Sequence, residues 1–182
     1  MNKLLPSLFL AALPVLASSV AIADDGRDRD DSRSDHSPLV EKVRNATAKY
    51  LDINRALADK YVAATPCVSG PNYGAMGVHF VRLDLLQDDG AVNAETPEAL
   101  IYEPTADGRM RLVGVEFISL ASNWTNGKVP VLDGHLLNYV GAPNRYGLPA
   151  FYEMHVWAWR DNSEGSFSDW NRRVSCEQQA AH

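Results

Sequence analysis

Residues 151–160 read FYEMHVWAWR, and this segment gives the first indication of the fold. Aromatic and β-branched side chains dominate it, which is typical of a strand in the interior of a sheet. Because side chains alternate along a strand, one face should carry Glu153, His155, Trp157 and Trp159. A buried strand rarely holds a carboxylate and an imidazole unless something pairs with them. This polar pair is therefore a lead toward function.

Three earlier segments also have the composition of strands, at residues 74–83, 98–104 and 109–120. The turn signal Ala-Asp-Gly at 106–108 separates the second from the third. A turn of this kind between two apolar runs predicts a β-hairpin. Together with residues 151–160, these segments indicate an antiparallel sheet.

A helical pattern precedes the strands. Apolar side chains recur at spacings of three and four from Leu39 to Tyr61. Pro38 suits the first position of a helix, and Pro66 would end it. We therefore predict a single α+β domain over residues 38–182, in which a long N-terminal amphipathic helix packs on a curved or barrel-like antiparallel sheet.

The first 37 residues have two distinct compositions. Residues 1–23 combine a lysine near the start, an apolar run and an A-x-A sequence, which is the pattern of a secretory signal peptide. Residues 24–37 read DDGRDRDDSRSDHS and lack apolar side chains, so we expect a disordered charged spacer. No later segment is apolar enough to span a bilayer. We expect a periplasmic or secreted protein without a membrane span after cleavage.

The two cysteines, Cys67 and Cys176, are far apart in the chain. In an oxidising compartment the simplest expectation is one disulfide between them. The alternative is that Cys67 is a catalytic thiol with a histidine partner.

The overall composition narrows the class of protein. The chain has 182 residues, of which 46% are hydrophobic, enough for one domain with a buried core. The formal net charge is -6 and no basic stripe is present, so we expect no nucleic-acid partner.

Each predicted strand has one or two polar residues among apolar neighbours, and these polar residues could bind a metal. Imidazole and carboxylate groups suit zinc, iron, manganese or copper. No short-spaced ligand motif is present, so the ligands would have to converge from separate strands. The leading hypothesis is a site for one divalent transition metal, formed by His79, His155, Glu103 and Glu116. The alternative is that the histidines are ordinary core residues and the glutamates pair with arginines.

Two other functions are open from the sequence. The first is non-enzymatic binding of a small apolar or aromatic ligand in a pocket lined by Tyr102, Glu153, Trp157 and Trp159. The second is a structural or interaction protein in which every polar strand residue is paired internally. Whether the protein is an enzyme is left open by these patterns.

Several motifs together resemble a family of uncharacterised exported bacterial proteins. They are AMGVHF at residues 75–80, then PEALIYEP, RLVGVEF, HVWAWRDNSEGSFSDWN and VSC. The resemblance covers nearly the whole predicted domain, up to Cys176. The chain departs from it at Ser163 and Arg172, where the pattern usually has proline. The resemblance implies an exported single domain but no particular activity.

Overall fold

The computed structural model describes residues 37–179. The predicted signal peptide and all but the last residue of the predicted spacer lie outside these residues. The helices are α1 Pro38–Thr47, η1 Ala48–Leu51, α2 Ile53–Ala58 and α3 Leu83–Leu86. The strands are β1 Val62–Ala63, β2 Val68–Gly70, β3 Gly74–Val81, β4 Ala99–Pro104, β5 Met110–Leu120, β6 Val131–Leu132, β7 His135–Leu136, β8 Asn138–Val140 and β9 Phe151–Val156.

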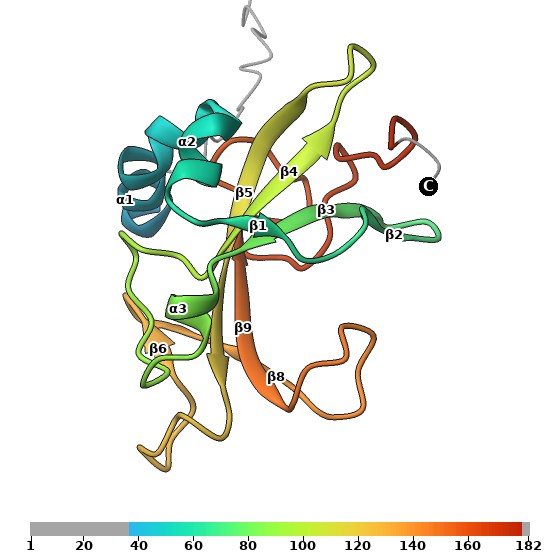
Figure 1. Cartoon of the computed structure of the whole chain (residues 1–182). Coiled ribbons are helices and arrows are strands. Elements are labelled where there is room, and N and C mark those ends of the chain that lie inside the picture. Colours follow the sequence, from blue (N-terminus) through green and yellow to red (C-terminus); the bar gives the residue numbers. More distant parts are fainter. Residues whose placement is uncertain (1–36, 180–182) are drawn as a thin grey trace, which may run out of the picture. The chain divides into compact units, whose positions relative to one another are not determined.

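The strands form mainly one antiparallel sheet (Figure 1). Its order is β1-β3-β4-β5-β9-β8, with β2 paired to β3, while β6 and β7 make a separate ribbon. Over residues 37–179 the two ends of this order do not pair with each other. The expected barrel-like sheet is therefore wrong, because the sheet stays open.

The predicted long N-terminal helix is also wrong. The segment is divided into α1, the short η1 and α2. The break comes at Asp52, whose backbone is extended (φ -91°, ψ 109°) and whose side chain accepts a hydrogen bond from the backbone N–H of Asn54 at 3.0 Å. An aspartate that bonds a nearby backbone N–H starts a new helix instead of continuing the old one. The fold is thus mostly antiparallel sheet with short helices.

Helices α1, η1 and α2 cover one face of the sheet, and Leu86 of α3 packs on the other. Figure 1 shows α1 and α2 together beside β4 and β5. The main core of this face includes Leu39, Val43, Val78, Leu100, Val115 and Val156. The opposite face has two smaller apolar clusters. One contains Ala75, Ile101, Val113, Trp157 and Val174, and the other contains Val81, Leu86, Ala99, Ile118 and Phe151. Along β3 and β9, polar residues lie between the members of these two clusters.

The C-terminal segment after β9 is irregular but is attached to the sheet. The indole N–H of Trp157 donates to the carbonyl of Ser168 at 2.6 Å. The predicted disulfide between Cys67 and Cys176 is confirmed and fixes the end of this segment. No helix over residues 37–179 is long and apolar enough to cross a membrane.

Candidate metal centre

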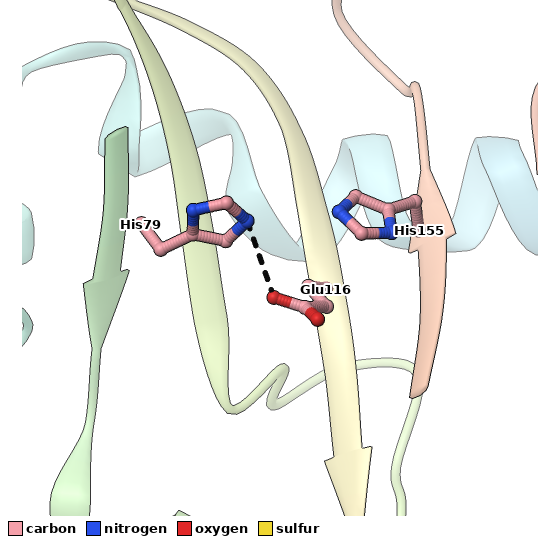
Figure 2. Close-up of side chains that lie close together, drawn as sticks. All are labelled: His79, Glu116 and His155. Atoms are coloured by element: carbon pink, nitrogen blue, oxygen red, sulfur yellow. Dashed lines mark ion pairs between the residues drawn. The ribbon is translucent and has the colours of Figure 1, made fainter. Parts of the chain in front are cut away.

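Three strands bring His79, Glu116 and His155 together on the face opposite α1 and α2. Glu116 of β5 and His155 of β9 are direct partners in the strand register. His79 comes from β3, which is separated from β5 by β4. Across β4, Ala99 lies opposite Glu116 and Ile101 lies opposite His79, so His79 and Glu116 stand in neighbouring rows of the same face. Figure 2 shows the two imidazole rings on either side of the Glu116 carboxylate.

The distances among these groups suit a single metal ion. Nε2 of His79 lies 3.4 Å from Oε2 of Glu116, and the centres of the two imidazole rings are 5.9 Å apart. One ligand atom from each residue lies within 4.8 Å of the other two. Ligand atoms around one zinc ion, each about 2.1 Å from it, are separated by roughly 3 to 4 Å. A small adjustment of the side chains is therefore enough to enclose an ion.

His155 is buried without its full set of hydrogen bonds. Its exposed fraction is 1%, and Nε2 has no hydrogen-bond partner among the described residues. Nδ1 lies 2.9 Å from Oε2 of Glu153, an ion-pair distance, although the contact lacks the geometry of a hydrogen bond. The ring also stacks on Trp157, with centroids 6.0 Å apart. A carboxylate beside Nδ1 favours a proton there, which leaves the lone pair of Nε2 free for a cation.

The other histidine is held by a threonine. Oγ1 of Thr65 lies 3.2 Å from Nδ1 of His79 and also accepts the backbone N–H of His79. These two contacts fix the imidazole ring, with its Nε2 directed toward Glu116. A proton on Nδ1 would be donated to Thr65, so Nε2 of His79 is also available as a ligand.

A second set of possible metal ligands shares His155 with the first set. Glu153, His155 and Asp169 likewise offer ligand atoms within 4.8 Å of one another. Asp169 comes from the irregular C-terminal segment. We refer to the five residues together as the histidine–carboxylate cluster, which comprises His79, Glu116, Glu153, His155 and Asp169.

Burial shifts the proton affinities within the histidine–carboxylate cluster. Burial lowers the pKa of His79 to about 3, so this imidazole is neutral at pH 7. Burial raises the pKa of Glu116 to about 8, although His155 opposes the shift. Burial disfavours a charge on His155, yet the carboxylates of Glu116 and Glu153 raise its pKa to about 9. Without a metal, Glu116 and His155 therefore both hold a proton at neutral pH, and a bound cation would replace these protons.

The fourth predicted ligand lies elsewhere. Glu103 is also buried, but its carboxylate accepts hydrogen bonds from Arg111 at 2.6 Å and from the backbone N–H of Ser175 at 3.0 Å. The register pairs Glu103 with Arg111, at the far end of β4 from Ala99. The structure thus brings together three of the four predicted ligands and leaves Glu103 in a separate ion pair.

The residues predicted to line an aromatic pocket do not share one. Tyr102 lies in the core on the helix side and donates its hydroxyl to the carbonyl of Tyr50 at 2.7 Å. The indole N–H of Trp159 donates to Oγ1 of Thr47 in α1 at 3.0 Å. Trp157 is on the other face, against His155, and Glu153 belongs to the histidine–carboxylate cluster. Strand β9 ends at Val156, and the expected alternation holds for Trp157 but fails at Trp159, which packs on the helix side.

Two further carboxyl groups, those of the half-buried Asp169 and the buried Glu98, were not among the predicted site residues. Asp169 joins the cluster from a segment without strand or helix periodicity, so no pattern could place it. Glu98 is buried beside β4 and accepts a hydrogen bond from the backbone N–H of Ile118 at 2.9 Å. Burial raises the pKa of Glu98 to about 8. Glu98 thus bonds to the backbone of β5 and does not belong to the histidine–carboxylate cluster.

Comparison of the chain with protein-family models, with curated proteins and with solved structures finds no match in any of the three. The function is therefore inferred from the chemistry of the residues alone.

Proposed function

We propose that the protein binds one divalent transition-metal ion through Nε2 of His79, Nε2 of His155 and the carboxylate of Glu116. Two imidazoles and one carboxylate form a ligand set that zinc, iron, manganese and copper all accept. The three residues come from strands that are paired in one sheet, so the ligands are held before any ion arrives. This preorganisation supports metal binding as a function of the folded protein.

The observation that carries the proposal is the state of His155. Its Nε2 is fully enclosed and has no hydrogen-bond partner within residues 37–179. Leaving a buried polar atom unsatisfied costs about 1 to 3 kcal/mol. A cation at the centre of the cluster removes this cost, and the neighbouring carboxylates supply the negative charge that a divalent ion requires.

Glu153 supports the proposed site from behind His155. A carboxylate on the non-coordinating nitrogen of a metal-bound histidine fixes the ring and raises its basicity. Three protein ligands also leave one or more positions around the ion for water or substrate. This open coordination is typical of metal ions that polarise a bound molecule or activate water.

The test is elemental analysis of the exported protein, purified without chelator and without a histidine tag. We expect near-stoichiometric metal in the wild type and almost none in the double variant His79→Ala, His155→Ala. His135→Ala is the control, because His135 packs on Phe167 outside the cluster. Circular dichroism should show that both variants are folded. Absence of metal from the wild type, even after reconstitution, would contradict the proposal.

We also propose that the protein works outside the cytoplasm, in the periplasm or after secretion. The disulfide between Cys67 and Cys176 supports this location, since such bonds persist in oxidising compartments. The N-terminal pattern of residues 1–23 supports it independently. Mass spectrometry of the protein from the periplasmic or culture fraction should give a mature chain that begins at Asp24.

A further inference from the structure

A cavity of about 140 Å³ adjoins the histidine–carboxylate cluster, and His79 and Glu116 form part of its wall. Most of the remaining wall is apolar and includes Val81, Leu86, Ile118, Leu148 and Phe151. An apolar cavity of about 150 Å³ in another protein is large enough to bind benzene. The cavity is therefore close in volume to one that holds a single aromatic ring.

The cavity has a route to solvent. Ala64 and Leu83 also line it, and both are exposed, with 51% of Leu83 accessible. Tyr146 forms another part of the wall, with its ring 6.3 Å from that of His79 and its hydroxyl 3.3 Å from Sδ of Met76. A small molecule can thus enter between exposed side chains and reach the cluster without unfolding of the sheet.

The polar residues of the cavity wall are His79, Glu116, Thr65 and Tyr146, and both Thr65 and Tyr146 lie near His79. Inside the cavity, a ligand would meet mostly apolar side chains, and His79 and Glu116 are the lining residues that belong to the proposed metal site. Apolar walls with a few convergent polar groups select a ligand that is largely apolar and has one polar atom. A second charge on the ligand would have no partner in these walls and would be costly to bury.

We propose that this cavity binds a single-ring aromatic molecule with one oxygen substituent, of the phenol class, whose oxygen faces His79 and Glu116. Coordination of that oxygen by the metal rests on the function proposed above. Binding of the ring does not, because the apolar wall exists without the ion. The two parts of the inference can therefore be tested separately.

Phenol and toluene make a suitable pair of probes, because they have the same size and differ only in the oxygen. The protein would be loaded with zinc and labelled at its isoleucine δ1 methyl groups for NMR titration. Ile118 lines the cavity, whereas Ile53 of α2 lies on the helix side and serves as an internal control. We expect both probes to shift the Ile118 signal and neither to shift that of Ile53. Phenol should bind about tenfold more tightly with zinc than without it, and toluene equally in both states.

Substitutions at the opening of the cavity, where Ala64 and Leu83 lie, provide a second test of the proposal. Ala64→Phe should fill the opening and abolish binding of both probes while zinc content stays unchanged. Ala63→Phe is the matched control, since Ala63 is the exposed neighbour in β1 and does not line the cavity. Leu83→Trp blocks the same opening from α3 and serves if Ala64→Phe does not fold.

The outcomes separate the two proposals. Zinc uptake without a shift of Ile118 by either probe would overturn the cavity inference and leave the metal site standing. Toluene binding by a protein that takes up no zinc would overturn the metal site and support the cavity. Equal affinity of phenol in the presence and absence of zinc would overturn the assignment of the oxygen to the metal.

Discussion

Glu153 and His155 form a buried pair on a single strand, with Oε2 of Glu153 2.9 Å from Nδ1 of His155. Alternate residues of a strand share a face, so β9 alone sets this arrangement. The register then places His155 opposite Glu116 on β5. This explains why an apolar strand carries two polar residues. Together they present one imidazole nitrogen, Nε2, to the neighbouring strands.

Substitution of Glu153 should weaken metal binding without removing a ligand. We expect Glu153→Gln to lower zinc affinity by about 10- to 100-fold, because the amide cannot stabilise the proton on Nδ1 of His155 as a carboxylate does. Competition with a chromogenic chelator measures this change. Glu164→Gln is the control, since Glu164 is paired with Arg172 at the surface. Unchanged affinity in Glu153→Gln would show that His155 needs no orienting carboxylate.

Two glutamates predicted as ligands should now behave differently. Glu116→Gln removes the only carboxylate of the proposed ligand set, so zinc content should fall to near background. Glu103→Gln should retain zinc at the wild-type level, because Glu103 is bonded to Arg111 and Ser175. Elemental analysis of both variants gives the comparison. Loss of zinc from Glu103→Gln while the sheet remains folded would contradict the assignment.

The difference between these glutamates shows what the sequence could predict. Alternation along a strand indicates which side chains share a face, and it associated Glu153 with His155 correctly. It does not give the register between strands. The register aligns Glu116 with His155 but puts Glu103 opposite Arg111, too far along β4 to reach the cluster. Convergence of residues from different strands was thus a hypothesis that only the fold could test.

The helix error has a different physical cause. Apolar residues on both sides of Asp52 face the same core, so their spacing continues across the break. The periodicity therefore conceals a change in backbone direction that the capping side chain of Asp52 produces. Asp169 has no periodic pattern at all, because its segment is held by tertiary contacts such as the bond between Trp157 and Ser168.

The stability of the metal-free protein should depend on pH through His79. The pKa of this residue is about 3 in the folded protein, against an ordinary value of 6.5. Between these values the unfolded chain binds a proton that the folded protein excludes, so the contribution of His79 to stability is lost as pH falls below 6.5. The slope from one such group is at most about 1.4 kcal/mol per pH unit.

Urea titrations between pH 7 and pH 4.5, with chelator present, can isolate this contribution. Over this range the wild type should lose stability relative to His79→Gln, which has no imidazole at this position. Glu116 and Glu98, whose raised pKa values favour folding as pH falls, are present in both proteins. His135→Gln should follow the wild type, because it removes a histidine outside the cluster. Equal losses in the wild type and His79→Gln would mean that His79 is protonated in the folded protein.

The disulfide should contribute to stability more than to the metal site. Cys67 and Cys176 are separated by 109 residues, and closing so long a loop stabilises the folded state by about 4 to 5 kcal/mol in the chain-entropy model. The double variant Cys67→Ser, Cys176→Ser should therefore unfold at a markedly lower urea concentration. Its zinc stoichiometry should be unchanged when it is folded, because β3, β5 and β9 hold the ligands through their own pairing.

Treatment of the wild type with a reductant should reproduce the lower urea midpoint, which separates the loss of the bond from the effect of the two serines. Zinc should be added only after the reductant is removed and the thiols are blocked, since free cysteines could bind the ion themselves. If the folded variant then took up no zinc, the C-terminal segment that carries Asp169 would be required for the metal site. The ligand set would have to be extended to include that carboxylate.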